Sequence, residues 1–413
     1  NFIQAPPNQA PTDISLTATS IAENQPTGST VGQFSTTDPD SGNTFTYTLV
    51  SGTGDTDNGS FQIVNGELRT NTALDFETKN SYSILVETAD QGGLTYQKQF
   101  TITVTNVNEA PTNINLSATS IAENQPSGSI VGNLSGVDAD ASSTFTYALV
   151  SGTGDTDNSS FSISNGQLVT GASFDFETKN SYSVRIRVTD QGNLTYEKPF
   201  TITVTDVNEA PVVVAGGVLA YNENATATVI DAGITVTDPE GGNLVGATIQ
   251  ISSLLTGDEL GFSAIGNISG TYSNGVLTLT GTDTVANYQA ALRSVTFRSN
   301  SEDSTANGTR TSTGISWRVD DGSLTSTAVS STVNITAVND VPVATAGATV
   351  TYVENASALV IDNTITLTDV DDTSIDSATI SITNPVTGDV LEFTNTQYIT
   401  GSYSNGVLTL TGP

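Results

Sequence analysis

The feature that most constrains this chain is a proline-containing hexapeptide that recurs at a fixed spacing. It reads Asn106-Val107-Asn108-Glu109-Ala110-Pro111, and one hundred residues later Asp206 to Pro211 repeats it with a single change. Looser copies run from Asn8 to Pro11 and from Asn339 to Pro342. Proline lacks an N–H and restrains the residue before it, so a β-strand cannot continue through these sites. We interpret them as linkers between tandem β domains.

The segments between the linkers are themselves repeated. The first two align without a gap at the spacing of the hexapeptides, and the next two align with each other, Glu223 corresponding to Glu354. Self-similarity at a fixed period is typical of an array of like structural units. The sequence therefore predicts five parts: a tail or linker remnant at 1–11, a first repeat at 12–110, a second at 111–210, a longer third at 211–341 and a partial fourth at 342–413.

Alternation of apolar and polar residues predicts β-strands throughout. Asn65-Gly66 lies between two such strands and favours a two-residue hairpin turn, as do the same pairs at 165–166, 274–275 and 405–406. Residues 285–293 predict a short helix, followed by a strand at 295–298. The fold class is otherwise all-β. In the first repeat we expect seven strands, centred near Ile14, Val31, Phe45, Phe61, Leu68, Ile84 and Ile102.

Composition excludes several classes of function. Forty-three acidic residues face eleven basic ones, a net charge of −32, so a nucleic-acid partner is excluded because phosphate contacts need a positive surface. The chain has no cysteine and no histidine, which removes disulfides, thiolate chemistry and the commonest zinc ligand. No stretch is apolar enough to span a bilayer. We expect no enzyme, because the paired carboxylates lie at domain ends where no cleft is implied.

The acidic residues fall at the ends of the predicted domains. In a seven-stranded domain whose strands alternate in direction, the loops after odd strands lie at one end and those after even strands at the other. The end of one repeat and the start of the next meet at a linker. This count places the following acids around the first linker: Glu23, Asp75 and Glu77 from the first repeat, and Asp138, Asp140 and Asp190 from the second.

So many carboxylates at one junction repel one another unless a cation lies among them. Calcium takes about six to eight oxygen ligands in flexible geometry, whereas magnesium keeps more water and zinc prefers His or Cys. Two acids separated by one residue, such as Asp75 and Glu77, can offer two oxygens to one ion. The pattern favours calcium. The alternative is a set of solvated acidic loops without metal, which keep a secreted protein soluble.

These elements occur in a definite order: Glu-Asn after the first strand, Asp-x-Glu, the linker, Asp-x-Asp, and an Asp before the last strand. In that order they resemble the cadherin repeat, specifically the bacterial cadherin-like kind, over the first two repeats. The resemblance implies a tandem array of seven-stranded Greek-key β-sandwich domains, with up to about three calcium ions at each junction that stiffen it into a rod. The third and fourth repeats, through 256–260, 287–297 and 319–322, look like the longer cadherin-like repeats of large RTX-type bacterial surface proteins.

Carried over position by position, the resemblance implies three sets of calcium ligands. The first junction has Glu23, Asp75, Glu77, Asn106, Asn108, Glu109, Asp138, Asp140 and Asp190. The second has Glu123, Asp175, Glu177, Asp206, Asn208, Glu209, Asp238, Glu240 and one of Asp320 or Asp321. The third has Glu223, Asn339, Asp340, Asp369 and Asp371, and no Asp-x-Glu is evident in the third repeat. The linker is one residue shorter than in animal cadherins, and Asn106 stands where the second copy has Asp206.

Two other features have a simpler interpretation. Asp55 and Asp57, with their counterparts in the second repeat, favour solvated turns over an extra calcium contact. Trp317 alternates with apolar neighbours on a predicted strand and is expected in the core rather than stacked on a sugar.

The expected function is a calcium-stabilised extracellular stalk of a bacterial cell-surface adhesin. Two alternatives remain open. The chain could be a subunit of a matrix fibre built by strand complementation between copies, or its repeats could bind copies on another cell. Its expected partners are therefore calcium and other copies of itself.

Overall fold

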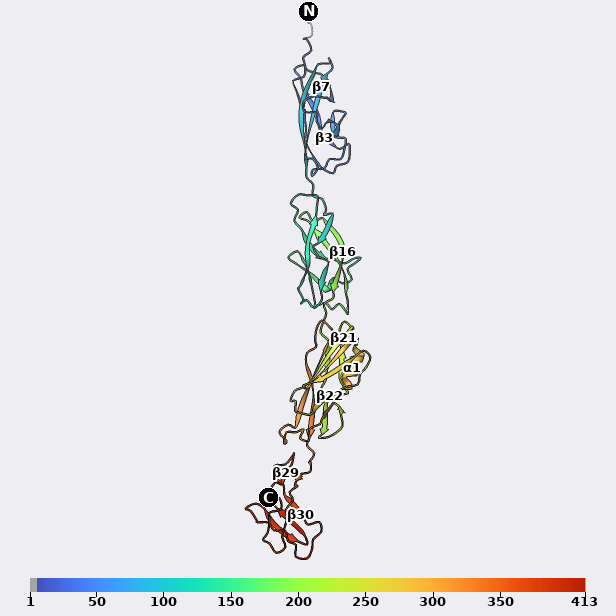
Figure 1. The fold of residues 1–413 in the computed structure, drawn as a ribbon. Helices are drawn as coiled ribbons and strands as arrows, with labels where there is room; N and C mark the ends of the chain where they lie inside the picture. The colour runs from blue at the N-terminus through green and yellow to red at the C-terminus, as the bar shows by residue number, and fades with distance from the viewer. Residues whose placement is uncertain (1–5, 413) are drawn as a thin grey trace, which may run out of the picture. The chain divides into compact units, whose positions relative to one another are not determined.

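The computed structural model describes residues 6–412 (Figure 1). Its backbone contacts divide the chain into two compact units, residues 1–207 and residues 208–413. The first unit holds two repeats of eight strands each, and the second holds a larger third repeat and a fourth with fewer strands.

Each of the first two repeats is a sandwich of two four-stranded sheets. In the first repeat the sheet orders are β1-β3-β6-β5 and β2-β8-β7-β4, and the second repeats them as β9-β11-β14-β13 and β10-β16-β15-β12. The strands of the first repeat are β1 (Asp13–Leu16), β2 (Ser20–Ala22), β3 (Thr30–Thr37), β4 (Phe45–Leu49), β5 (Phe61–Val64), β6 (Glu67–Thr70), β7 (Ser81–Asp90) and β8 (Thr95–Thr105). Those of the second are β9 (Asn113–Leu116), β10 (Ser120–Ala122), β11 (Ile130–Val137), β12 (Thr146–Leu149), β13 (Phe161–Ser164), β14 (Gln167–Thr170), β15 (Ser181–Thr189) and β16 (Thr195–Thr205). A short 3₁₀ turn precedes β5 at Asn58–Ser60 and β13 at Asn158–Ser160.

All seven predicted strands of the first repeat are present, but the first is split between the two sheets. β1 pairs antiparallel with β3, and β2 crosses to pair parallel with β8. The crossing chain passes close over β3, where a Cβ on Gly32 would lie 2.8 Å from the carbonyl oxygen of Ala18. Only glycine allows this approach. Gly132 has the same relation to Ala118 in the second repeat.

The core lies between the two sheets, as alternation along the strands requires. Ile84 and Ile102 are fully buried, and the intervening threonines of β8 are exposed. Burying such a side chain contributes about 1.5–3 kcal/mol. The predicted hairpin turns are also present, with Asn65 and Gly66 at φ values of 53° and 79°, the left-handed region that this turn needs.

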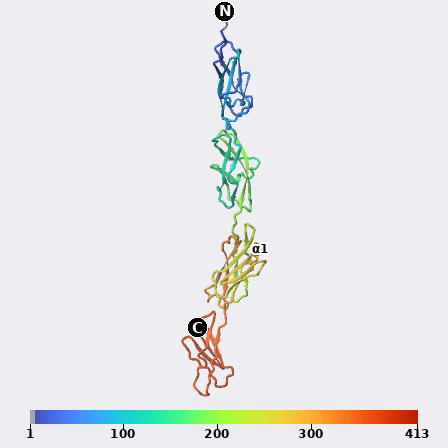
Figure 2. The same cartoon turned by 45° about the horizontal axis from the view of Figure 1, so that its top comes forward.

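The third repeat is larger than a seven-stranded sandwich. Its main sheet has the order β18-β27-β26-β21-β24-β23, and smaller sheets pair β19-β25-β22 and β17-β20. The predicted helix α1 (Val285–Arg293) is confirmed and is labelled in Figure 2. It buries Tyr288, Ala291 and Leu292. The strands are β17 (Val212–Val214), β18 (Val218–Asn222), β19 (Thr228–Val229), β20 (Thr235–Thr237), β21 (Asn243–Ile251), β22 (Asp258–Gly261), β23 (Ser269–Ser273), β24 (Val276–Thr284), β25 (Thr296–Ser299), β26 (Ser312–Asp320) and β27 (Val329–Thr336).

Trp317 is fully buried in the core of the third repeat, as predicted, and its indole N–H donates to Ser331 Oγ at 3.0 Å. The fourth repeat pairs β28 with β29 and has a sheet of order β30-β32-β31. In its described residues, 342–412, only Leu391 and Leu408 are buried apolar side chains. Its strands are β28 (Val343–Thr345), β29 (Thr366–Thr368), β30 (Ser377–Ser381), β31 (Thr400–Ser404) and β32 (Val407–Thr411).

Candidate metal centre at the repeat junctions

A buried glutamate joins the first repeat to the linker that follows it. Glu23 comes directly after β2 and is only 1% exposed. Its Oε2 accepts from the backbone N–H of Phe76 at 2.8 Å, and its Oε1 accepts from that of Val107 at 2.7 Å. The next residue, Asn24, turns the chain away at a φ of 59°, a conformation that asparagine tolerates better than most residues.

The second half of the linker is bound to the second repeat. Asn108 Nδ2 donates to Asp190 Oδ2 at 2.8 Å, and the N–H of Glu109 donates to Asp140 Oδ2 at 2.8 Å. Gly192 makes room for this contact, because a Cβ there would lie 2.5 Å from Asn108 Nδ2. The loops that the strand count placed around this linker therefore do lie beside it.

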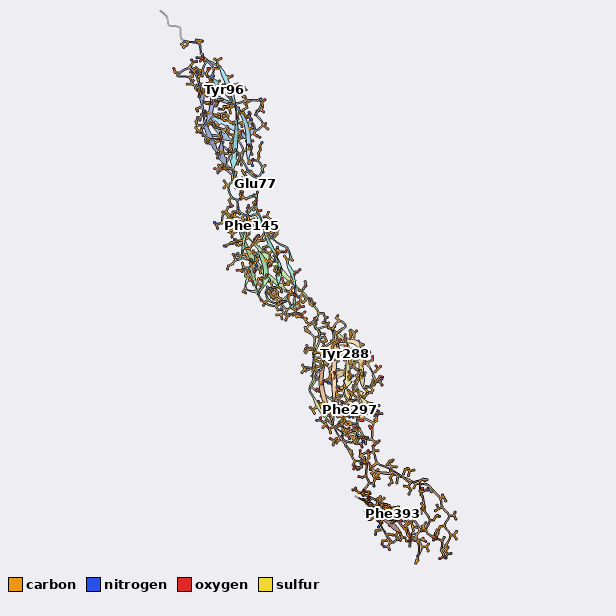
Figure 3. All side chains as sticks on the ribbon, turned by 90° about the vertical axis from the view of Figure 1, so that its left-hand side faces the viewer. Glu77, Tyr96, Phe145, Tyr288, Phe297 and Phe393 are labelled. Atoms are coloured by element: carbon orange, nitrogen blue, oxygen red, sulfur yellow. The ribbon has the colours of Figure 1, made fainter. Side chains whose placement is uncertain are left out.

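The acidic side chains form a continuous cluster across this junction. Carboxylate oxygens of Glu23, Asp75 and Glu77 lie within 4.8 Å of one another, as do those of Glu77, Glu109 and Asp140. Glu77 belongs to both groups and is labelled in Figure 3. The amides of Asn106 and Asn24 donate to Glu77 at 3.1 Å and to Glu109 at 2.5 Å, respectively. The junction thus presents carboxylates from both repeats and from the linker to one small volume.

The electrostatics of this cluster are unfavourable without a cation. Burial, then the nearby charges of Glu23 and Glu109, raises the pKa of Glu77. Burial likewise raises the pKa of Glu109, and the charges of Glu23 and Asp140 add to it, while the amide of Asn24 opposes the rise. Burial also acts on Asp190, but the hydrogen bond from Asn108 and those from its own loop hold the pKa of that carboxyl below its usual range. The repulsion is therefore concentrated on Glu77 and Glu109.

The donor set fits calcium. Among the described residues, Glu109 Oε2 and Asp138 Oδ2 are buried and have no hydrogen-bond partner. Buried carboxylate oxygens are normally satisfied, so these two oxygens are suited to bind a cation. The candidate ligand atoms of the cluster are carboxylate oxygens, which calcium prefers.

At the end of the first unit, the residues before the second linker repeat the arrangement around Glu23. Glu123 is 1% exposed and accepts from the N–H groups of Phe176 at 2.8 Å and Val207 at 2.7 Å. Oxygens of Glu123, Asp175 and Glu177 lie within 4.8 Å of one another. The backbone N–H of Glu177 lowers its pKa, but burial and the charges of Glu123 and Asp206 outweigh this and raise the pKa.

In the second unit, the linker residue Asn208 contacts one of two adjacent aspartates. Asn208 Nδ2 donates to Asp321 Oδ2 at 3.0 Å, the counterpart of the contact between Asn108 and Asp190. Asp320 ends β26 and instead accepts from Gly322 N and Thr325 Oγ1, at 2.7 and 2.9 Å. Asp321 is therefore the junction residue, and Asp320 is a turn residue.

The acidic side chains beside Asp321 repel one another. The N–H of Glu209 donates to the carboxylate of Glu240. Burial and the adjacent Glu240 raise the pKa of Asp238 to about 6. A positive charge near these acids would therefore offset their repulsion, as it would at the first junction.

The third junction lies within the second unit. Glu223, 3% exposed, accepts from Val338 N at 3.0 Å, and Asp340 N donates to Asp371 Oδ2 at 2.5 Å. Asp371 N in turn donates to Asp369 Oδ1 at 3.0 Å, whereas Asn339 donates to the carbonyl of Asp340 at 2.5 Å. In the part of the chain that the structure describes, the three groups of acids with mutual distances within 4.8 Å all lie in the first unit.

Glu302, which the sequence analysis did not assign, lies at this third junction. Burial raises the pKa of Asp340, and the next largest cause is the charge of Glu302. Asp340 Oδ2 is buried without a hydrogen-bond partner among the described residues. The sequence signal was the acid pair Glu302-Asp303, which does not match Asp-x-Glu.

The start of the described chain forms a further half-site that the sequence analysis did not assign. Asn8 Nδ2 donates to Asp90 Oδ2 at 2.8 Å, and Gln9 N donates to Asp40 Oδ2 at 2.6 Å. These contacts match those of Asn108 and Glu109, so residues 8–11 have the linker conformation. The spacing of one hundred residues from Asp140 and Asp190 could have identified Asp40 and Asp90.

Asp55 and Asp57 have structural roles. Asp55 Oδ2 accepts from Gly52 N at 3.0 Å within its turn. Asp57 accepts from Ser83 N at 2.8 Å and pairs with Lys79. The turn interpretation is therefore confirmed for Asp55, whereas the side chain of Asp57 is only 12% exposed and binds Ser83 and Lys79 instead of its own turn.

Comparison with known proteins identifies the first two repeats. The model of the cadherin domain matches residues 17–105 and 117–205, less than half of the chain. Protocadherin Fat 4 of Mus musculus is 34% identical over 176 residues, 40% of this chain and 3% of that protein. Protocadherin-16 of Homo sapiens is 31% identical over 199 residues, 46% of this chain and 6% of that protein. A solved structure of protocadherin gamma B2 extracellular cadherin domains 1-5 has a TM-score of 0.46 at 22% identity, covering 81% of this chain and 61% of that one.

These comparisons confirm the all-β tandem of cadherin-like sandwich domains, and the matched domain is an adhesion domain rather than an enzyme. The chain spans only a few per cent of the length of these curated relatives. The relatives are animal proteins, so the expected bacterial origin gains no support and stays a prediction. Among the described residues, no helix has the length and apolar character needed to cross a membrane. The segments 17–105 and 117–205 are thus cadherin-type repeats.

Proposed function

We propose that this chain is a calcium-stabilised extracellular segment of an adhesion-type protein, in which calcium at each linker holds neighbouring repeats in a fixed relation. The observation that carries the proposal is the acidic cluster at the first junction. It spans two repeats and a linker, and its member Glu109 has a buried carboxylate oxygen without a partner among the described residues. An adhesion segment needs such a support, because a short linker by itself lets the two domains reorient.

At the first junction, three groups of residues would hold the ions. Glu23, Asp75 and Glu77 approach from the first repeat, Asp138, Asp140 and Asp190 approach from the second, and Asn106, Asn108 and Glu109 come from the linker. Bound calcium supplies the positive charge that offsets the repulsion on Glu77 and Glu109. Because those two carboxylates lie between the repeats, an ion bound to them links both sides.

The same roles are proposed for the other two junctions. At the second linker, Glu123, Asp175, Glu177 and Asp206 would bind calcium within the first unit, and Asn208, Glu209, Asp238, Glu240 and Asp321 would do so within the second unit. The third would use Glu223, Asn339, Asp340, Asp369 and Asp371. A stalk at a cell surface, bacterial or otherwise, is the finer form of this proposal. The matrix-fibre and homophilic alternatives stay predictions.

Small-angle scattering of the whole chain, first in calcium and then in excess chelator, tests the proposal. We expect a particle with one defined shape in calcium and a flexible chain of folded domains in chelator. Equilibrium dialysis with ⁴⁵Ca should show several bound ions per chain. Identical scattering in the two conditions, with no bound ion, would contradict the proposal and leave solvated acidic loops.

A further inference from the structure

The third repeat lacks an Asp-x-Glu, yet its buried glutamate is held by the same pair of hydrogen bonds as in the other repeats. Glu223 Oε1 accepts from Ser304 N at 2.5 Å, and its Oε2 accepts from Val338 N at 3.0 Å. In the first repeat Glu23 accepts from Phe76 N and Val107 N. Ser304 therefore occupies the backbone position of Phe76, the middle residue of Asp-x-Glu.

Two acidic residues, Glu302 and Asp303, come directly before Ser304. Asp303 caps its own turn, accepting from Asn307 N at 2.9 and 3.0 Å, much as Asp75 accepts from Thr78 N at 3.0 Å. Asp303 thus takes the place of Asp75. At the place of Glu77, two residues later, the third repeat has Thr305.

The other acid, Glu302, lies close to the same turn. Its Oε2 accepts from Asn224 Nδ2 at 3.3 Å, which places it beside the Glu-Asn turn at the junction end of the repeat. Asp340 Oδ2, at the same junction, is buried without a partner among the described residues. Ser304, which follows Asp303, is fully buried, and its Oγ has no hydrogen-bond partner among the described residues. The wall formed by residues 302–304 therefore contains one buried oxygen, Ser304 Oγ, without a hydrogen-bond partner among the described residues.

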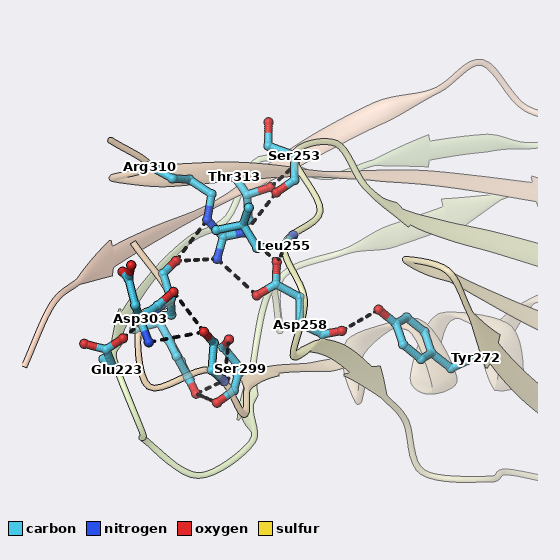
Figure 4. Close-up of polar contacts among 12 residues, drawn as sticks. Glu223, Ser253, Leu255, Asp258, Tyr272, Ser299, Asp303, Arg310 and Thr313 are labelled. Atoms are coloured by element: carbon cyan, nitrogen blue, oxygen red, sulfur yellow. Dashed lines mark hydrogen bonds and ion pairs between the residues drawn. The ribbon is translucent and has the colours of Figure 1, made fainter. Parts of the chain in front are cut away.

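A buried ion pair holds this wall in place (Figure 4). Arg310 Nη2 donates to Asp258 Oδ1 at 3.0 Å, and the side chains of the pair are 8% and 0% exposed. The same guanidinium donates to the carbonyl of Ser304 at 2.6 Å through Nη2 and at 3.1 Å through Nε. It also donates to the carbonyl of Ser253 at 2.9 Å. One residue, Ser304, is thus fixed by Arg310 through its carbonyl and by Glu223 through its N–H.

We propose that residues 302–304, anchored by the Arg310–Asp258 ion pair, form the wall of the third-junction calcium site, with Glu302 and Asp303 as ligands in place of an Asp-x-Glu. This inference rests on the proposed function. Arg310 is a positioning residue, because it contacts the loop and not the ion. A fixed geometry at Ser304 matters because calcium affinity depends on the rigidity of the ligand set as well as on its charge.

The test uses the single tryptophan of the whole chain as a reporter. Trp317 is fully buried in the third repeat, so its fluorescence follows the unfolding of that repeat. We expect calcium to raise the midpoint of the thermal transition of the unmutated chain. Glu302→Gln and Asp303→Asn should each reduce that rise by about half, since the third repeat has proposed sites at both ends. In chelator their midpoints should be unchanged or higher, because one repelling charge is removed.

Glu259→Gln is the matched control. Glu259 is an exposed acid of the same repeat, paired with Arg298 at 2.7 Å, and its replacement should leave the calcium-induced rise intact. An undiminished rise in both Glu302→Gln and Asp303→Asn would overturn the inference alone. A Trp317 transition of the unmutated chain that does not respond to calcium would overturn the proposed function itself.

A test of the positioning role of the ion pair requires a variant that leaves no buried charge unpaired. Asp258→Leu combined with Arg310→Met removes both charges together. We expect this variant to retain a Trp317 transition in chelator and to lose calcium response as Glu302→Gln does. A retained transition with a full calcium response would refute the positioning role. Should this variant not fold, Glu302→Gln and Asp303→Asn decide the ligand assignment.

Discussion

Replacing Glu23 with glutamine should loosen the first junction even without calcium. The carboxylate of Glu23 accepts from two backbone N–H groups, one on each oxygen: those of Phe76 at 2.8 Å and Val107 at 2.7 Å. A glutamine can accept only one of these bonds, because its other terminal atom is itself a donor. A buried N–H left without a partner costs about 1–3 kcal/mol. Since about 1.4 kcal/mol corresponds to a factor of ten, the released amide should exchange its hydrogen about 5- to 150-fold faster.

Hydrogen exchange in excess chelator, read at individual amides, measures this effect apart from any lost ligand. Either Phe76 or Val107 should lose protection, while amides of β15 in the second repeat keep theirs. Glu123→Gln is the matched variant and should move the effect to Phe176 and Val207, which are held at the same distances. Glu87→Gln, at a side chain that accepts from Gln97 Nε2 at 2.9 Å and lies on a strand away from the linker, serves as the control. Unchanged protection of both Phe76 and Val107 in Glu23→Gln would refute the reasoning.

Three further predictions concern the junctions. Gly192→Ala should displace Asn108, because the new Cβ would lie 2.5 Å from its Nδ2, and calcium titration should show weaker binding than in Gly59→Ala, where a Cβ meets nothing within 4 Å. Equal affinity of these two variants would argue against a role for the Asn108–Asp190 contact. Asp321→Asn should weaken calcium binding more than Asp320→Asn, since only Asp321 is bonded to the linker residue Asn208, and the reverse order in a titration would contradict that assignment. Because the pKa values of Glu77 and Glu109 are raised, these two carboxyl groups hold more protons in the folded state than in the unfolded state, so their contribution to stability in chelator should fall as pH rises through those pKa values. In calcium the dependence should reverse, with half-saturation at pH 5.5 requiring more calcium than at pH 7.5, and a pH-independent titration would count against these carboxylates as ligands.

Local features of this chain are readable from the sequence because neighbouring residues decide them. The Asn-Gly turns depend on two residues that accept left-handed backbone, and helix α1 depends on the composition of nine consecutive residues. The junction ends at which Glu23 and Asp140 meet the linker follow from strand parity, which needs only a count of strands. The repeat spacing, in turn, determines that the arrangement recurs.

Contacts between distant residues are what only the tertiary structure decides. The first strand divides between two sheets because the chain crosses over Gly32, and nothing in the alternation pattern marks that crossing. Asp320 and Asp321 are adjacent acids, and the end of β26 determines which one faces Asn208. Glu302 reaches the third junction because Arg310 ties its loop to Asp258, a side chain 52 residues away in sequence. The energy of such a contact depends on burial and on geometry in three dimensions, and neither is encoded in the spacing of the residues along the chain.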